Sequence, residues 1–181
     1  SITADLKTRA LQLKVGDPTL DTTEVGPLIR PLEVNRVHDW VQEAIQDGAE
    51  LICGGEKISN TCYAPTILLN PSATSKVSTM EVFGPVICLY SYRELDDAIQ
   101  QANALAVSFQ ACIFTESIDT AMHAYKQLNG SAIMVNEHTA FRVDWMPFAG
   151  LSHSGLGVGG IPHTFQDMQV EKMLVIKSKY I

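Results

Sequence analysis

Residues 86–136 read VICLYSYRELDDAIQQANALAVSFQACIFTESIDTAMHAYKQLNGSAIMVN, and short apolar runs alternate there with amphipathic ones. Three of the apolar runs have the length and content of buried strands. They are residues 86–92, 110–115 and 131–136. Between them, residues 94–105 and 117–128 carry apolar side chains at helical spacing, so we expect a helix in each. This order predicts a parallel sheet covered by helices on both faces.

The residues before this stretch extend the same alternation. Apolar spacing predicts helices over 4–15 and from Pro31 onward, where a proline costs nothing in the first helical turn. Apolar runs at 50–53 and 64–69 predict strands, and Pro65 confines the second to a sheet edge or to its own first residues. We therefore expect an α/β fold with three layers, α/β/α, around a mostly parallel sheet.

The pattern changes after Asn136. A long stretch rich in glycine, histidine and aromatic residues precedes a last predicted strand at 173–176. A loop of that length usually has a function or contacts a partner. Within it, residues 155–160 (GLGVGG) contain half of a dinucleotide fingerprint, but they do not follow a first strand. We interpret them as a tight turn beneath a neighbouring chain or domain, with a phosphate site as the alternative.

Length and charge exclude several classes of protein. The chain has 181 residues, and 20 acidic against 13 basic residues give it a net charge of −7. Such a surface repels nucleic-acid phosphates and anionic lipids, so we expect neither nucleic acid nor membrane as a partner. The five histidines have no metal-pair spacing, so we expect no metal site. The four cysteines lack CxxC spacing, which favours reduced thiols and a cytoplasmic protein.

None of the cysteines has the helix N-terminus or basic neighbour that activates a nucleophile. Cys88 and Cys112 lie within apolar runs, where we expect burial to raise the thiol pKa. Cys62 lies in a polar loop without an adjacent base. Cys53 ends a strand before two glycines, and it leaves open a small cysteine hydrolase in which it would act with a histidine.

One short motif combines a carboxylate with an aromatic ring. In residues 80–85, MEVFGP, Glu81 and Phe83 lie two positions apart, so they point to the same side of an extended segment. A carboxylate can accept hydrogen bonds from a ribose diol, and a ring can pack against a planar heterocycle. The pair is therefore a candidate nucleotide site, and an ordinary turn with an exposed Glu and a core Phe is the alternative.

This motif resembles the E-[IV]-F-G-P-V signature of the NAD(P)-dependent aldehyde dehydrogenase superfamily. Further ordered matches extend over nearly the whole chain: VGDP at 15–18, VGPLI at 25–29, YAPT at 63–66, VN at 135–136, PFAG at 147–150 and SGLG at 154–157. The resemblance implies the catalytic-domain fold of that family over residues 1–170. It also implies an oligomerisation strand and tail over 171–181, through which a homo-oligomer, a dimer or tetramer, would form.

The resemblance also assigns roles to residues of this chain. Glu81 matches the glutamate that holds the nicotinamide ribose, and Phe83 matches the aromatic residue near the nicotinamide, which implies NAD or NADP as the cofactor. Asn136 and Phe148 match positions near the aldehyde tunnel.

Arg142 lies between these two tunnel positions in the sequence. Its guanidinium could bind a substrate carboxylate, phosphate or phosphonate. A salt bridge to Asp144, or a contact across a subunit boundary, is the alternative.

In the family, a cysteine thiolate attacks the aldehyde, and the resulting cysteine thioester is hydrolysed to a carboxylic acid. The resemblance places that cysteine, in a G-Q-x-C motif, upstream of Ser1, together with the general-base glutamate and the oxyanion asparagine. The resemblance also does not include the family's Rossmann-type cofactor domain. We therefore expect part of an enzyme, inactive by itself and without a catalytic residue of its own. A non-catalytic binding or assembly module with the same fold is the alternative.

Overall fold

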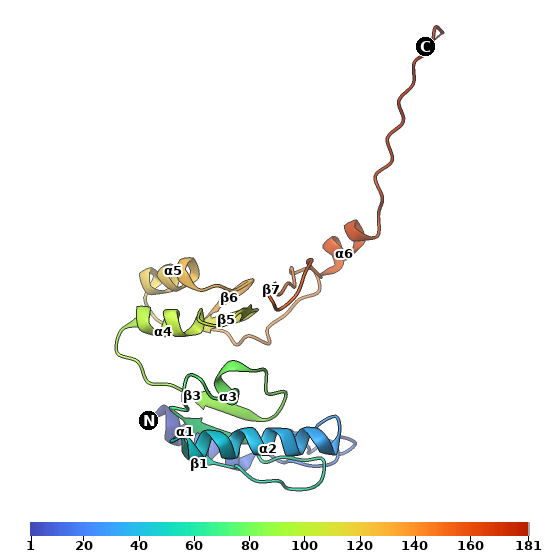
Figure 1. The fold of residues 1–181 in the computed structure, drawn as a ribbon. Coiled ribbons are helices and arrows are strands. Elements are labelled where there is room, and N and C mark those ends of the chain that lie inside the picture. The colour runs from blue at the N-terminus through green and yellow to red at the C-terminus, as the bar shows by residue number, and fades with distance from the viewer. Residues whose placement is uncertain (181) are drawn as a thin grey trace. The chain divides into compact units, whose positions relative to one another are not determined.

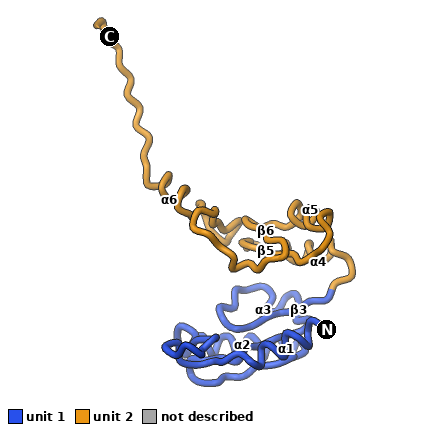
Figure 2. Tube along the Cα trace, turned by 180° about the vertical axis from the view of Figure 1, so that it is seen from behind, with its two compact units in different colours: residues 1–91 blue, residues 92–181 orange. Residues whose placement is uncertain are grey.

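The computed structural model describes residues 1–180, which form two compact units (Figures 1 and 2). Unit 1 comprises residues 1–91, and unit 2 begins at Tyr92. Among the described residues, every helix is too short or too polar to span a lipid bilayer.

Unit 1 has a single sheet between helices (Figure 1). Its elements are α1 (Ile2–Gln12), α2 (Pro31–Gln46), β1 (Glu50–Cys53), β2 (Thr66–Leu69), α3 (Lys76–Thr79) and β3 (Val86–Leu89). The central strand β2 is antiparallel to β1 and parallel to β3. The parallel register runs from Thr66 opposite Val86 to Leu69 opposite Leu89.

The two faces of this sheet are covered differently. On one face, the fully buried Val37 of α2 packs in a cluster with Leu68 of β2. On the other face, Ile67 and Ile87 line a hollow of about 290 Å³ together with Leu13, which follows α1. Because side chains alternate along a strand, adjacent residues of β2 contact opposite layers. Unit 1 thus has the predicted α/β/α layering.

Local signals explain where these elements end. Pro31 occupies the first turn of α2, and Gly48, with φ of +102°, follows its C-cap. Gly54 has φ of +74°, and a Cβ there would lie 2.3 Å from the Pro65 carbonyl oxygen. Only glycine fits such a turn, so the two-glycine signal correctly marks the end of β1.

Unit 2 contains the predicted β–α–β crossover. Its elements are α4 (Leu95–Ala102), β4 (Val107–Ser108), β5 (Gln110–Ile113), α5 (Ile118–Gln127), β6 (Ala132–Val135), β7 (Leu151–Ser152) and α6 (Ile161–Asp167). Strands β5 and β6 pair in parallel, from Gln110 opposite Ala132 to Ile113 opposite Val135. Strands β4 and β7 form a separate antiparallel pair.

Polar side chains join α4 to α5. His123 Nε2 lies 2.5 Å from the Asp96 carboxylate. The side-chain amide of Asn103 donates to the Gln127 carbonyl and accepts from the Asn129 N–H, both at 2.8 Å. At the start of α5, Ser117 is the predicted N-cap, because its hydroxyl accepts from the Thr120 N–H.

The α/β class is confirmed. The described strands form three small sheets within the two units. Residues 173–176, predicted as a strand, pair with no other described strand and are 62–86% exposed. Their predicted pairing with another subunit stays a prediction. A strand needs a neighbour for its backbone N–H and C=O groups, and the described chain supplies none there.

Candidate functional site

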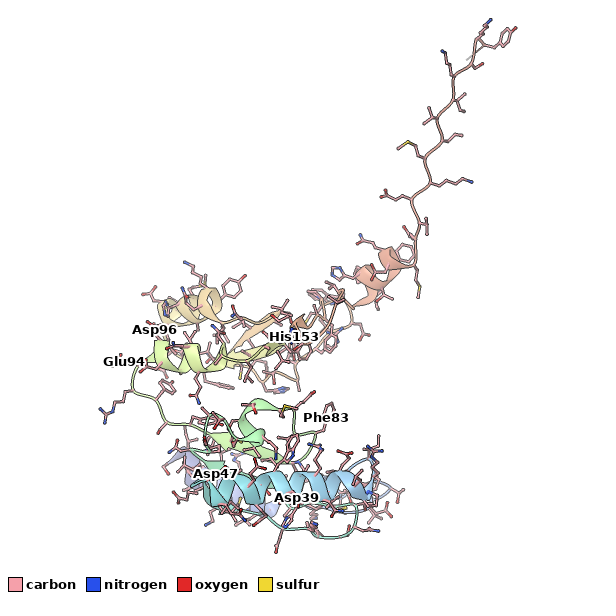
Figure 3. All side chains as sticks on the ribbon, in the orientation of Figure 1. Asp39, Asp47, Phe83, Glu94, Asp96 and His153 are labelled. Atoms are coloured by element: carbon pink, nitrogen blue, oxygen red, sulfur yellow. The ribbon has the colours of Figure 1, made fainter. Side chains whose placement is uncertain are left out.

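The loop that carries Glu81 and Phe83 connects α3 to β3 in unit 1. The Phe83 backbone is left-handed, with φ of +47°, and 77% of the residue is exposed (Figure 3). Such a conformation costs a residue with a side chain about 1–2 kcal/mol, so neighbouring contacts must hold it. The predicted alternative of a core phenylalanine is therefore wrong, and the ring is available for stacking.

A hollow of about 510 Å³ lies beside Phe83. Residues 25–29, Glu33 and residues 83–85 line it. Glu81 is exposed, and within residues 1–180 its carboxylate accepts no hydrogen bond. The hollow is lined by Phe83 and not by Glu81, which lies two residues earlier in the same loop. An exposed ring beside a hollow, with an exposed carboxylate in the same loop, suits a nicotinamide ribose, which combines a planar heterocycle with a diol.

Helix α2 contacts this loop through a residue that the sequence analysis missed. Arg36 Nη2 donates to the carbonyl oxygen of Val82 at 2.6 Å, and Arg36 Nε donates to Glu33 at 2.6 Å. Hydrogen bonds from Arg36 and then from Arg30 lower the pKa of the Glu33 carboxyl. The i,i+3 spacing of Glu33 and Arg36 is visible in the sequence, but nothing in it points to Val82, 46 residues further along.

In unit 2, Asn136 extends the β5–β6 ladder by one position. Its amide oxygen accepts from the Thr115 N–H and its amide nitrogen donates to the Thr115 carbonyl, both at 2.8 Å. The Asn136 N–H donates to the Ile113 carbonyl at 2.8 Å, and its φ is +57°. Both polar groups of the side chain are thus bonded to backbone at the end of the two strands.

Arg142 and Phe148 contact each other directly. The guanidinium carbon of Arg142 lies 4.3 Å from the centre of the Phe148 ring, and that ring meets Phe109 edge-on at 4.8 Å. Within residues 1–180, Arg142 stacks on Phe148 and forms no ion pair with Asp144, so the salt-bridge alternative is wrong, whereas a contact across a subunit boundary stays a prediction. The guanidinium stacks on an aromatic face, and within residues 1–180 its N–H groups form no hydrogen bond, so they can bind an anion.

The glycine-rich residues 155–160 fold back on the segment that carries Phe148. Phe148 and Gly159 exchange two backbone hydrogen bonds, at 3.0 and 2.7 Å. A Cβ on Gly160 would lie 2.5 Å from the Met146 carbonyl oxygen. The predicted tight turn therefore forms, and it lies against residues of its own unit.

The cysteines divide by burial. Cys53 and Cys62 are buried, and the Cys53 thiol lies 3.9 Å from the Pro65 carbonyl with no histidine bonded to it among the described residues. Burial raises the pKa of the Cys88 thiol, as predicted. Cys112 is exposed, so its predicted burial is wrong, because the side of β5 that carries it is left open in unit 2.

Helices and mostly parallel strands in both units, with the β–α–β crossover of unit 2, define a protein of the α/β class. The profile of the aldehyde dehydrogenase family matches residues 1–174, and the chain belongs to that family. A 3-sulfolactaldehyde dehydrogenase from Priestia aryabhattai is 37% identical over 171 residues, which cover 94% of this chain and 36% of the relative.

Solved structures agree with this assignment. Aldehyde dehydrogenase 21 from Physcomitrella patens, in complex with its reaction product succinate, has a TM-score of 0.89 at 29% identity. The match covers 92% of this chain and 34% of that enzyme. Glyceraldehyde-3-phosphate dehydrogenase from Methanocaldococcus jannaschii, complexed with NADP, has a TM-score of 0.86 at 31% identity. The match covers 91% of this chain and 36% of that enzyme. Another solved member holds NAD⁺. The chain thus spans 36% of the length of the first curated relative and about as much of the solved ones.

Proposed function

We propose that this chain is the part of an NAD(P)-dependent aldehyde dehydrogenase that orients the nicotinamide and shapes the aldehyde site. The observation that carries the proposal is the exposed, left-handed Phe83, two residues after an exposed Glu81 whose carboxylate accepts no hydrogen bond within residues 1–180. Family membership and the NADP and NAD⁺ complexes of solved members support the choice of cofactor.

In this proposal, Glu81 accepts hydrogen bonds from the ribose hydroxyls, and Phe83 packs against the nicotinamide. The nicotinamide, when bound, supplies the acceptor for the hydride that leaves the aldehyde carbon. Both residues act by orientation, since neither is a nucleophile. Misplacing a reacting group by 1 Å can lower the rate about a hundredfold. A loop with a fixed conformation therefore keeps the rate of hydride transfer high by holding the nicotinamide in position.

Asn136, Arg142 and Phe148 are the proposed aldehyde-site residues. Because the Asn136 amide is engaged by Thr115, Asn136 contributes by holding the strand ends in place. Phe148 supplies an apolar wall, and Arg142 binds an anionic group of the aldehyde. The names of three similar proteins support an anionic substrate, since they contain a sulfonated aldehyde, a phosphorylated aldehyde and succinate.

The covalent chemistry is assigned to a cysteine outside this chain. We infer that a thiolate adds to the aldehyde, that loss of hydride leaves a thioester, and that water hydrolyses the thioester to the acid. The burial of Cys53 and Cys62 and the raised pKa of Cys88 argue against any of them as nucleophile. Cys112 is exposed, but no basic side chain is bonded to its thiol among the described residues, so we expect the chain alone to be inactive.

The C-terminal residues suggest how the protein assembles. Residues 173–176 are apolar and exposed, and an unpaired extended segment can add to the sheet edge of another subunit. We infer that 171–181 is an oligomerisation segment following a catalytic-domain part at 1–170, although Ile181 lies outside the described residues. The four free thiols support a cytoplasmic location.

A hybrid enzyme tests the proposal. This chain replaces the matching segment of the Priestia aryabhattai dehydrogenase, and NAD(P)H formation is followed by absorbance. We expect the hybrid to oxidise aldehydes and the chain alone to form no NAD(P)H. Glu81→Ala in the hybrid should raise the KM for the cofactor about tenfold or more, the effect of one lost charged hydrogen bond. A folded, inactive hybrid would favour the non-catalytic assembly module.

A further inference from the structure

Arg36 is held by three different contacts on α2 and the adjacent loop. Its Nε donates to the Glu33 carboxylate and its Nη2 to the Val82 carbonyl, each at 2.6 Å. Its guanidinium carbon also lies 4.4 Å from the centre of the Trp40 ring. The side chains of Arg36 and Glu33 are only 26% and 18% exposed. A guanidinium engaged on two edges and one face has a single orientation.

The Val82 carbonyl belongs to the residue between Glu81 and Phe83. The hydrogen bond from Arg36 therefore fixes the peptide unit that joins Val82 to Phe83. On the other side of Phe83, Gly84 lies so close to α2 that a Cβ there would come within 3.0 Å of a Val37 methyl group. Helix α2 thus holds the loop on both sides of the left-handed Phe83, whose φ is +47°.

We propose that Arg36 is a positioning residue, which keeps the loop in the conformation that presents Glu81 and Phe83 to the nicotinamide ribose. That the loop binds a nicotinamide ribose rests on the proposed function, whereas the role of Arg36 in holding the loop does not. Glu33 orients Arg36 by accepting from Nε, and the planar guanidinium then donates to Val82 in a second direction. A lysine, as a point charge, lacks this two-directional geometry.

The chain offers a matched control. Arg30 pairs with the other oxygen of the same Glu33 carboxylate, at 3.0 Å, but its side chain is 64% exposed. Within residues 1–180, the hydrogen bonds that this side chain donates go to Glu33. Arg30→Met therefore removes a salt bridge to Glu33 and leaves the Arg36–Val82 hydrogen bond in place. Arg36→Met removes that hydrogen bond, and Arg36→Lys keeps the positive charge without the planar donor pair.

The first measurement is the NMR order parameter of the backbone amides of Val82, Phe83 and Gly84 in the ligand-free chain. We expect about 0.85 in the wild type and in Arg30→Met, and below about 0.6 in Arg36→Met and Arg36→Lys. The amide of Leu68 in β2 reports whether unit 1 is folded in each variant. If Arg36→Met does not fold, Glu33→Gln is used, and the same loss of order is expected at reduced amplitude. Unchanged order in the folded variants would overturn the role of Arg36.

The second measurement titrates the hybrid enzyme with NADH and follows the fluorescence of the bound nicotinamide. We expect Arg30→Met to bind NADH as the unsubstituted hybrid does, with an apparent Kd at least tenfold weaker in Arg36→Met. An unchanged Kd in Glu81→Ala would overturn the proposed cofactor role, a result distinct from an unchanged order parameter. Loop disorder in Arg36→Met without a change in Kd would overturn the link between Arg36 and the ligand.

Discussion

The Asn136 side chain forms two 2.8 Å hydrogen bonds to the backbone of Thr115, one in each direction. The side-chain amide thereby continues the parallel pairing of β5 with β6 at the point where the regular ladder ends with Ile113 opposite Val135. The left-handed backbone of Asn136, with φ of +57°, turns the chain there, and asparagine tolerates this conformation better than most residues.

Asn136→Ala should therefore destabilise unit 2 by about 1–2 kcal/mol, because two exposed hydrogen bonds and a tolerated left-handed residue are lost. Hydrogen exchange of the β5 and β6 amides measures this loss in unit 2 alone. Asn136→Gly is the control, since it keeps the backbone conformation and loses only the amide. Wild-type protection in Asn136→Ala would contradict a structural role for this side chain.

Tyr63 should make the stability of unit 1 depend on alkaline pH. It is fully buried, its hydroxyl lies 3.3 Å from His38 Nδ1, and burial, with the charges of Asp39 and Glu56, raises its pKa to about 12. An unfolded tyrosine ionises near pH 10. The unfolded state therefore releases the proton first, and stability that is complete below pH 10 is lost as the pH rises from 10 to 12.

The expected loss over that range is up to about 3 kcal/mol, from two pKa units at 1.36 kcal/mol each. Urea unfolding between pH 8 and 12, followed by the fluorescence of Trp40 beside the same core, measures it. Tyr63→Phe should not show this decline, and Tyr92→Phe, at an exposed position, should behave as the wild type. Parallel pH curves for wild type and Tyr63→Phe would disprove the prediction.

Alkylation should distinguish the four cysteines. We expect iodoacetamide at pH 8 to label Cys112 first, because it is the exposed cysteine of the four. Cys88 should react more slowly, owing to its raised thiol pKa, and buried Cys53 and Cys62 should react last. Peptide mass spectrometry measures the order, and Cys112→Ser should remove the fast phase. Fast, selective labelling of Cys53 would instead favour the cysteine hydrolase.

Arg142 should determine whether anionic aldehydes are preferred. In the hybrid enzyme, Arg142→Ala should raise the KM for a sulfonated or phosphorylated aldehyde about tenfold or more, as expected for a lost charged hydrogen bond. The KM for a neutral aldehyde should change little, since Phe148 remains as the apolar wall. Arg93→Ala, at another exposed arginine of unit 2, is the control. Equal effects on both aldehydes would remove Arg142 from substrate binding.

Local sequence signals predicted most of the helices and strands of this chain. Pro31 marks the start of α2, and Ser117 caps α5 as expected, because both act on backbone within a few residues. The motif around Glu81 and Phe83 likewise pointed to the loop before β3. The contact between Arg36 and Val82 could not be found in this way, because it joins residues 46 positions apart through a backbone carbonyl that any residue type provides.

The sequence by itself determined the α/β class and the family, because periodicity and short motifs are local, and it supplied the residues that we propose for a nicotinamide and an aldehyde. Only the tertiary structure decided which of these side chains are available. It left the Phe83 ring exposed, engaged the Asn136 amide with Thr115 and placed Arg142 on Phe148. It also left Cys112 exposed and residues 173–176 unpaired. Exposure and pairing depend on which segments meet in space, and an apolar run has the same composition whether a neighbour covers it or not.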